Sequence, residues 1–146
     1  MSTNSQDSQW ISLLGQARVI AVVGLSPKPD RASFRVASHL QQAGYRIIPV
    51  RPMAGEILGE PCYASLDAIP QEIRVDIVDV FRRSEETESV AEEAVRIGAR
   101  CLWLQSGILN DNAMAIARAA GLLAFQDLCL MVEHRRLASL LSSSKT

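Results

Sequence analysis

Five short apolar segments, separated by stretches with helical periodicity, most constrain what this chain can fold into. Each segment is a continuous apolar run, as expected of a strand that is covered on both faces of a sheet. The segments are RVIAVVG, YRIIPV, VDIVDVF, RCLWLQ and LLAF, at residues 18–24, 45–50, 75–81, 100–105 and 122–125. Strand and helix alternate throughout, so right-handed crossovers should join parallel neighbours. The sequence therefore predicts an α/β, doubly wound parallel sheet of about five strands with helices on both faces.

The stretches between these runs carry helix start and stop signals. Ser33 and Asn110 each stand where a side-chain cap would begin a helix, and glycines stand where helices should end. The predicted helices run from Asp7 to Gly15, Ser33 to Gly44, Ser84 to Gly98, Asn110 to Ala120 and Cys129 to Leu141. Residues 51–70 look like a loop with one short helical turn at 66–69.

Length and composition limit the class of protein. The 146 residues suffice for one domain, 1–146, with residues 1–5 and 142–146 expected to be flexible tails. A net charge of -1 gives no general attraction to nucleic acid or to an anionic membrane. Three cysteines without C-x-x-C spacing favour a reducing compartment over disulfides or a metal site. No signal peptide or spanning segment is evident, so we expect a cytoplasmic protein.

Cations collect where the predicted strands end. In a parallel sheet the carboxyl ends of the strands share one edge, and ligands bind there near the switch in strand order. The residues that follow the first three strands include Lys28, Arg31, Arg35, Arg51 and Arg82. Arginines beside a helix N-terminus form an anion site, and phosphate is its natural occupant.

The first turn does not match the NAD-binding fingerprint. Gly24 is followed by Ser26 and Pro29 where G-x-G-x-x-G would place further glycines. Arg51 stands at the end of the second strand, where an acidic residue would hold the ribose of NAD. An arginine there suits a ribose that carries an extra phosphate, which both NADP and coenzyme A have. The sequence disfavours NAD.

Five segments in order carry a family resemblance: VVGLSPKPDRASFRV, YRIIPVRP, VDIVDVFRR, LWLQSGI and MVEHRRL. Together they resemble the small stand-alone CoA-binding proteins, whose domain is similar to the N-terminal CoA-binding domain of the succinyl-CoA synthetase alpha subunit. The resemblance runs from about Ile11 to Leu137. It implies a Rossmann-like fold with CoA lying across the strand ends.

The resemblance also assigns roles to residues. It implies phosphate contacts from the first turn, nucleotide contacts from the ends of the second and third strands, and pantetheine contacts after the fourth. The contact to Arg51 rests on its charge, because many relatives have Asn or Ser there. The predicted cofactor-binding residues are Gly24, Leu25, Ser26, Lys28, Arg31, Ser33, Arg35, Val50, Arg51, Phe81, Arg82, Gln105 and Gly107.

Function is predicted to be non-catalytic binding of CoA or acyl-CoA. The phosphohistidine domain of the synthetase has no counterpart here, and no nucleophile is spaced to work with His134 and Glu133. We expect His134 on a helix surface or at an interface, and no catalytic or metal residues. The alternatives are a small NADP- or CoA-dependent enzyme, or a metabolite-sensing partner protein. Apolar residues of the last helix leave a homo-oligomer open; they are Leu130, Leu137, Leu140 and Leu141.

Overall fold

The computed structural model describes residues 5–144. Strands and helices alternate along the chain, as the apolar runs predicted. The helices are α1 (Ser5–Gln16), α2 (Ala32–Gln42), α3 (Thr87–Arg96), α4 (Asp111–Ala119) and α5 (Leu130–Ser144). The strands are β1 (Val19–Val23), β2 (Arg46–Val50), β3 (Glu56–Ile57), β4 (Glu60–Pro61), β5 (Ile77–Val80), β6 (Cys101–Leu104) and β7 (Leu123–Phe125). Two 3-10 turns complete the list, η1 (Leu66–Ala68) and η2 (Ser84–Glu86).

Five of the strands form one parallel sheet in the order β2-β1-β5-β6-β7. Val23, at the end of β1, pairs with Val50 of β2 and with Val80 of β5. The carboxyl ends of all five strands therefore lie along one edge, and the chain reverses its direction of travel across the sheet between β2 and β5. This arrangement confirms the predicted Rossmann-like α/β fold.

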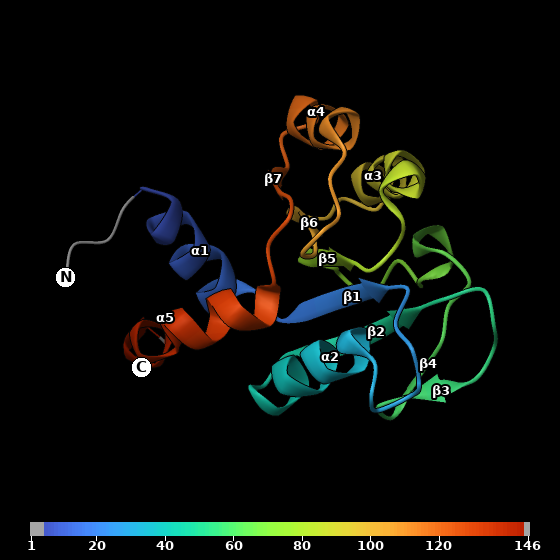
Figure 1. The fold of residues 1–146 in the computed structure, drawn as a ribbon, viewed down its shortest axis with the longest axis horizontal. Helices are drawn as coiled ribbons and strands as arrows, with labels where there is room; N and C mark the ends of the chain where they lie inside the picture. The colour runs from blue at the N-terminus through green and yellow to red at the C-terminus, as the bar shows by residue number, and fades with distance from the viewer. Residues whose placement is uncertain (1–4, 145–146) are drawn as a thin grey trace.

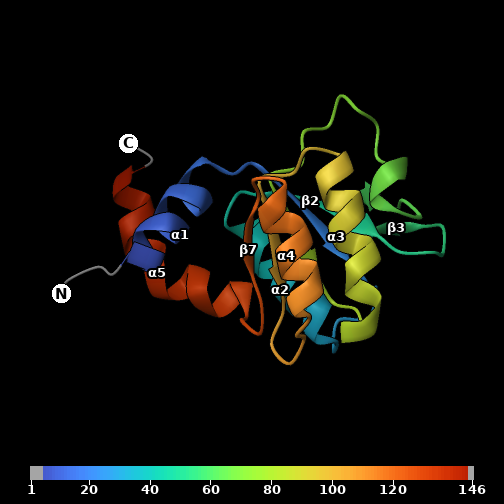
Figure 2. The same cartoon turned by 90° about the horizontal axis from the view of Figure 1, so that it is seen from above.

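Helices cover both faces of the sheet (Figures 1 and 2). One apolar core joins α1, α2 and α5 to one face, through residues such as Trp10, Leu40 and Leu137. The other core joins α3 and α4 to the opposite face, through Val90 and Met114. Because each strand is buried on both sides, its sequence is a continuous apolar run and not an alternating one.

The two terminal helices pack against each other. The Trp10 ring of α1 lies 5.5 Å from Phe125 and 5.3 Å from Trp103, centroid to centroid. Arg136 of α5 reaches across to pair with Asp7, at 2.6 Å. The predicted apolar surplus of α5 is therefore mostly covered within the chain: Leu130, Leu137 and Leu141 are buried, and Leu140 is exposed. The homo-oligomer stays a prediction.

Local boundaries differ from the predicted ones in two instructive places. Residues 51–70 contain the short antiparallel hairpin β3–β4 where a loop was predicted, and η1 matches the predicted turn. Two-residue strands have no periodicity that a sequence could reveal. Helix α5 runs to Ser144, and α1 begins at Ser5. The rest of the predicted tails, 1–4 and 145–146, lies outside the described residues. Within 5–144 no helix is long and apolar enough to cross a membrane.

Candidate functional site

The turn that follows β1 passes very close to its neighbours at the strand edge. Gly24 has φ +87°, and its N–H donates to the carbonyl oxygen of Val50 at 2.8 Å. A Cβ at this position would overlap the carbonyl oxygen of Phe81. Only glycine satisfies both the positive φ and the close approach. The turn is therefore fixed against the ends of β2 and β5.

Two serine hydroxyls hold the rest of this turn in shape. Ser33 Oγ accepts the N–H of Ser26 at 3.0 Å, and Ser26 Oγ accepts the N–H of Lys28 at 3.1 Å. The prediction that Ser33 caps the helix is wrong, because Arg31 occupies the cap position and makes no side-chain cap bond. Ser33 lies inside the first turn of α2, where its hydroxyl bonds across to the loop. Both hydroxyls keep their own hydrogen for donation to a ligand.

A hollow of about 670 Å³ opens between this turn, the start of α2 and the end of β2. It contains three cations, Lys28, Arg31 and Arg51, and no acidic residue. Within residues 5–144, none of the three forms an ion pair with a carboxylate. The N–H groups of Ala32 and Ser33 belong to the first turn of α2, where no intrahelical acceptor is available. Positive charge, a helix N-terminus and free N–H groups define an anion site.

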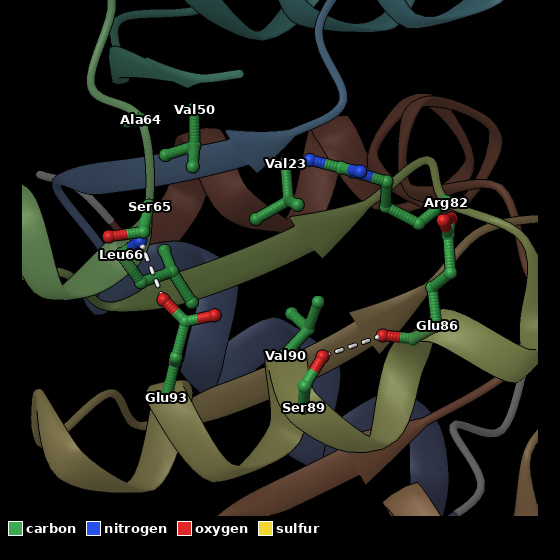
Figure 3. A pocket seen from close by; sticks show the side chains of 10 residues that line it. All are labelled: Val23, Val50, Ala64, Ser65, Leu66, Arg82, Glu86, Ser89, Val90 and Glu93. Atoms are coloured by element: carbon green, nitrogen blue, oxygen red, sulfur yellow. Dashed lines mark hydrogen bonds between the residues drawn. The ribbon is translucent and has the colours of Figure 1, made fainter. Parts of the chain in front are cut away.

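A second hollow, of about 220 Å³, lies on the α3 side of the same strand ends (Figure 3). Val23, Val50, Leu66 and Val90 form its apolar part, and Ser65, Ser89, Glu86 and Glu93 supply polar groups. Its wall is held by a bond from the N–H of Leu66 to Glu93 Oε1, at 3.0 Å. Apolar contacts combined with several hydrogen-bonding groups suit a flat polar ring such as a nucleobase.

The two hollows share the same three strand ends. Consecutive residues of β1, β2 and β5 line one hollow and then the other: Val23 and Gly24, Val50 and Arg51, Arg82 and Phe81. The Arg82 side chain extends from the end of β5 toward Val23 (Figure 3). Its Nε is buried and has no hydrogen-bond partner among residues 5–144. An unpaired guanidinium nitrogen at this place fits a ligand that brings an oxyanion.

The strand ends on the β6 and β7 side differ, because their polar groups already have partners. Gln105 is buried, and its Nε2 donates to Asp79 Oδ1 at 2.5 Å. The N–H of Gly107 donates to Asp127 Oδ1 at 2.7 Å. Gln126 accepts the N–H of Asn110 at 2.8 Å. These bonds shape the loop after β6, and the predicted ligand contacts of Gln105 and Gly107 stay a prediction.

Asp79 is a buried carboxyl that the sequence analysis did not single out. It lies within β5, fully buried, and burial raises its pKa to about 7 against the opposing effect of the Gln105 hydrogen bond. Its Oδ2 has no partner. The signal was present in VDIVDVF, where Asp79, the second of two aspartates, interrupts the apolar run IVDV.

The structure brings most of the predicted site residues together, and separates a few. Leu25 is buried in the core, so only its backbone can reach a ligand. Arg35 faces a different hollow, and its Nη1 donates to the carbonyl oxygen of Asp30 at 2.6 Å. Val50 and Arg82 line the smaller hollow. The larger hollow contains Gly24, Ser26, Lys28, Arg31, Ser33, Arg51 and Phe81.

Residues 18–135 match the family model of the CoA binding domain. The chain belongs to this family of CoA-binding domains. A Bacillus subtilis relative, the uncharacterised protein YneT, is 42% identical over 131 residues, which cover 90% of this chain and 96% of the relative. A solved structure from Thermus thermophilus, cell-free ID.343, has a TM-score of 0.86 at 36% identity, and the match covers 92% of this chain and 99% of that one.

Larger enzymes contain a similar segment. An ADP-forming acetate–CoA ligase of Archaeoglobus fulgidus is 33% identical over 63 residues, which are 43% of this chain but 9% of the ligase. The acetyl-coenzyme A synthetase 1 of Candidatus Korarchaeum cryptofilum shares the fold, with a TM-score of 0.69 at 22% identity over 79% of this chain and 27% of that one.

Proposed function

We propose that this protein binds coenzyme A or acyl-CoA across the ends of β1, β2 and β5, without catalysing a reaction. The observation that carries the proposal is the pair of hollows on either side of these three strand ends. One carries three cations, the other combines an apolar floor with polar and acidic groups, and consecutive residues line both. A ligand that has phosphates at one end of a nucleoside matches this division.

The larger hollow would hold the phosphates. Arg31 and Lys28 come from the turn, Arg51 comes from β2, and the first N–H groups of α2 face the same space. Charge-assisted bonds from arginine to phosphate are among the stronger hydrogen bonds in proteins. We assign Arg51 to the 3′-phosphate of the ribose, because it stands at the end of the strand that fixes a ribose in dinucleotide-binding units.

The smaller hollow would hold the adenine ring. Val23, Val50 and Val90 offer apolar contact, while Glu86 offers an acceptor to an exocyclic amino group. Arg82 reaches from β5 toward the point where the two hollows meet, and its unpaired Nε would donate to a phosphate oxygen. The pantetheine arm would then run toward Gly107, whose N–H is already bonded to Asp127.

The residues that line the two hollows support the proposal of a binding role without chemistry. The larger one contains no His, Cys, Asp or Glu. In the smaller one, Glu93 is committed to the backbone of η1. Neither provides an activated nucleophile with an adjacent base. The alternative of a small NADP-dependent enzyme is favoured only by Arg51, whose charge would suit the 2′-phosphate of NADP equally well.

Calorimetry with CoA, dephospho-CoA and NADPH at one ionic strength tests the proposal. We expect CoA to bind, and dephospho-CoA to bind about tenfold more weakly, since one charged contact is lost. Arg51→Gln should weaken CoA and leave dephospho-CoA unchanged. Arg74→Gln, an exposed arginine outside both hollows, is the matched control. If CoA does not bind, the proposal is overturned. If Arg51→Gln weakens the binding of CoA and of dephospho-CoA equally, the role assigned to Arg51 is overturned.

A second assay addresses catalysis. Acetyl-CoA incubated with the protein should keep its thioester, so that a thiol reagent detects no more free CoA than in buffer. Faster thiol release with the protein, or NADPH affinity equal to that of CoA, would favour the enzymatic alternative.

A further inference from the structure

A third hollow, of about 480 Å³, lies between α2 and α5 on the outer side of the first turn of α2. It shares no lining residue with the hollow that we assign to CoA phosphates. Its polar side chains are Arg35, Ser38, His39 and Gln42 from α2, and Arg135 from α5. No acidic residue lines it.

The two arginines of this hollow have no carboxylate partner among residues 5–144. Both are exposed, whereas the neighbouring Arg136 is paired with Asp7 and with Glu133. Two guanidinium groups from different helices, with no carboxylate beside them in the part of the chain that the structure describes, favour binding of an anion.

A histidine pair forms the inner wall. His39 Nε2 and His134 Nδ1 lie 3.0 Å apart, so one nitrogen must donate and the other accept. His134 is 8% exposed and packs against the ring of Tyr45, at 5.7 Å between centroids. The predicted surface position of His134 is therefore wrong. His39 is the half-buried member that faces the hollow.

The protonation of His39 depends on the charge of a neighbouring arginine. Burial, and then the positive charge of Arg135, lower the pKa of His39. The charged or titratable groups around His39 are Arg35 of α2, His134 and Arg135 of α5, and Tyr45 beyond His134. An anion beside Arg135 would cancel its repulsion and let His39 take up a proton, while His134 Nδ1 accepts the resulting N–H.

We propose that the hollow between α2 and α5 binds a small doubly charged oxyanion, held by Arg35 and Arg135 and by protonated His39. This site is separate from the CoA site, and the proposal does not depend on CoA binding. Affinity should rise as the pH falls from 8 to 6, because binding is linked to protonation of His39. Arg35 also donates to the backbone carbonyl oxygen of Asp30, in the turn that follows β1.

Nuclear magnetic resonance offers a direct test, since the chain has only two histidines. The ring protons of His39 and His134 are assigned by comparison with His39→Gln and titrated from pH 5 to 8, with and without sulfate at constant ionic strength. Sulfate keeps its charge over this range, so any pH dependence comes from the protein. We expect saturating sulfate to raise the pKa of His39 by about one unit, a tenfold preference for the protonated state.

Arg35→Gln combined with Arg135→Gln should abolish this shift. Arg18→Gln combined with Arg74→Gln removes the same charge from exposed arginines that also lack ion pairs within the described residues, and should retain the shift. Succinate in place of sulfate distinguishes a carboxylate ligand from a tetrahedral one. The proposal is overturned if neither anion moves the titration of His39, or if the shift persists in Arg35→Gln/Arg135→Gln.

Discussion

Polar residues at the two halves of the strand edge differ in whether they already have partners within the protein. At the ends of β1 and β2, the cations Lys28, Arg31 and Arg51 border a hollow and have no carboxylate partners within the described chain. At the ends of β6 and β7, Gln105 and Asp127 are each bonded to another part of the protein. The position of a polar residue at a strand end therefore does not identify a ligand contact. What matters is whether its hydrogen-bonding groups are already used.

The first test concerns Asp79 of β5, the partner of Gln105 on the β6 side, because its expected effect is the largest. Its pKa is about 7 in the folded protein against an ordinary value of 3.8, so the folded state holds the proton more tightly than the unfolded state. Asp79 must therefore make stability fall as the pH rises from about 4 to 7 and level off above 7. Between pH 5 and pH 8 the loss is about 3 kcal/mol.

Asp79→Asn should remove this loss. We expect the difference in unfolding free energy, variant minus wild type, to increase by about 3 kcal/mol between pH 5 and pH 8. Urea denaturation at the two pH values measures this difference. CoA affinity should be unchanged, because the carboxyl is buried within the sheet. Equal pH dependence of stability in both proteins would show that Asp79 is ionised throughout this range. A loss of CoA affinity in Asp79→Asn would show that the buried carboxyl affects binding at the other half of the strand edge.

Two glycines provide a matched comparison of the halves. Gly24 and Gly107 both have a positive φ, +87° and +82°, but only a Cβ at Gly24 would meet a backbone carbonyl. Gly107→Ala should cost about 1 kcal/mol for the strained φ, and Gly24→Ala about 2 kcal/mol more for the overlap. Urea denaturation measures both. Equal costs would mean that the turn after β1 can move away from Phe81.

The smallest expected effect concerns charge on the binding side. Arg31→Gln should weaken CoA by about tenfold in calorimetry, because it removes a cation that has no internal partner. Arg74→Gln is the control, since this exposed arginine lines neither of the two hollows. An equal loss in both variants would mean that overall charge, and not the contact from Arg31, attracts the ligand.

The sequence was sufficient for the sheet and for the cationic edge. Continuous apolar runs predicted strands buried on both sides, and parallel strands necessarily bring Arg31 and Arg51 to the same edge. The sequence did not predict the direction in which individual side chains point. Ser33 has the residue type of a helix cap, yet its hydroxyl bonds to Ser26 across the turn. Arg35, four residues after Arg31, lines a different hollow.

Contacts between residues far apart in the chain were also hidden. Gln105 lies at a strand end, as expected, but its partner Asp79 comes from the neighbouring strand. His134 and His39 meet only because α5 packs beside α2. The sequence alone placed His134 on a helix surface or at an interface. Such pairings depend on packing between helices, for which neither periodicity nor a local motif gives a signal.

The hairpin β3–β4 has a consequence for the outermost strand of the sheet. Beyond the hairpin, Tyr63 forms a bridge to β2: its N–H donates to the carbonyl oxygen of Pro49, and its own carbonyl accepts the N–H of Arg51. Exposed strand edges are templates on which a second chain can add a strand and aggregate. Here the chain covers part of that edge itself. The same two bonds anchor the backbone of Arg51, so protection against misassembly and preorganisation of a cation come from one short segment.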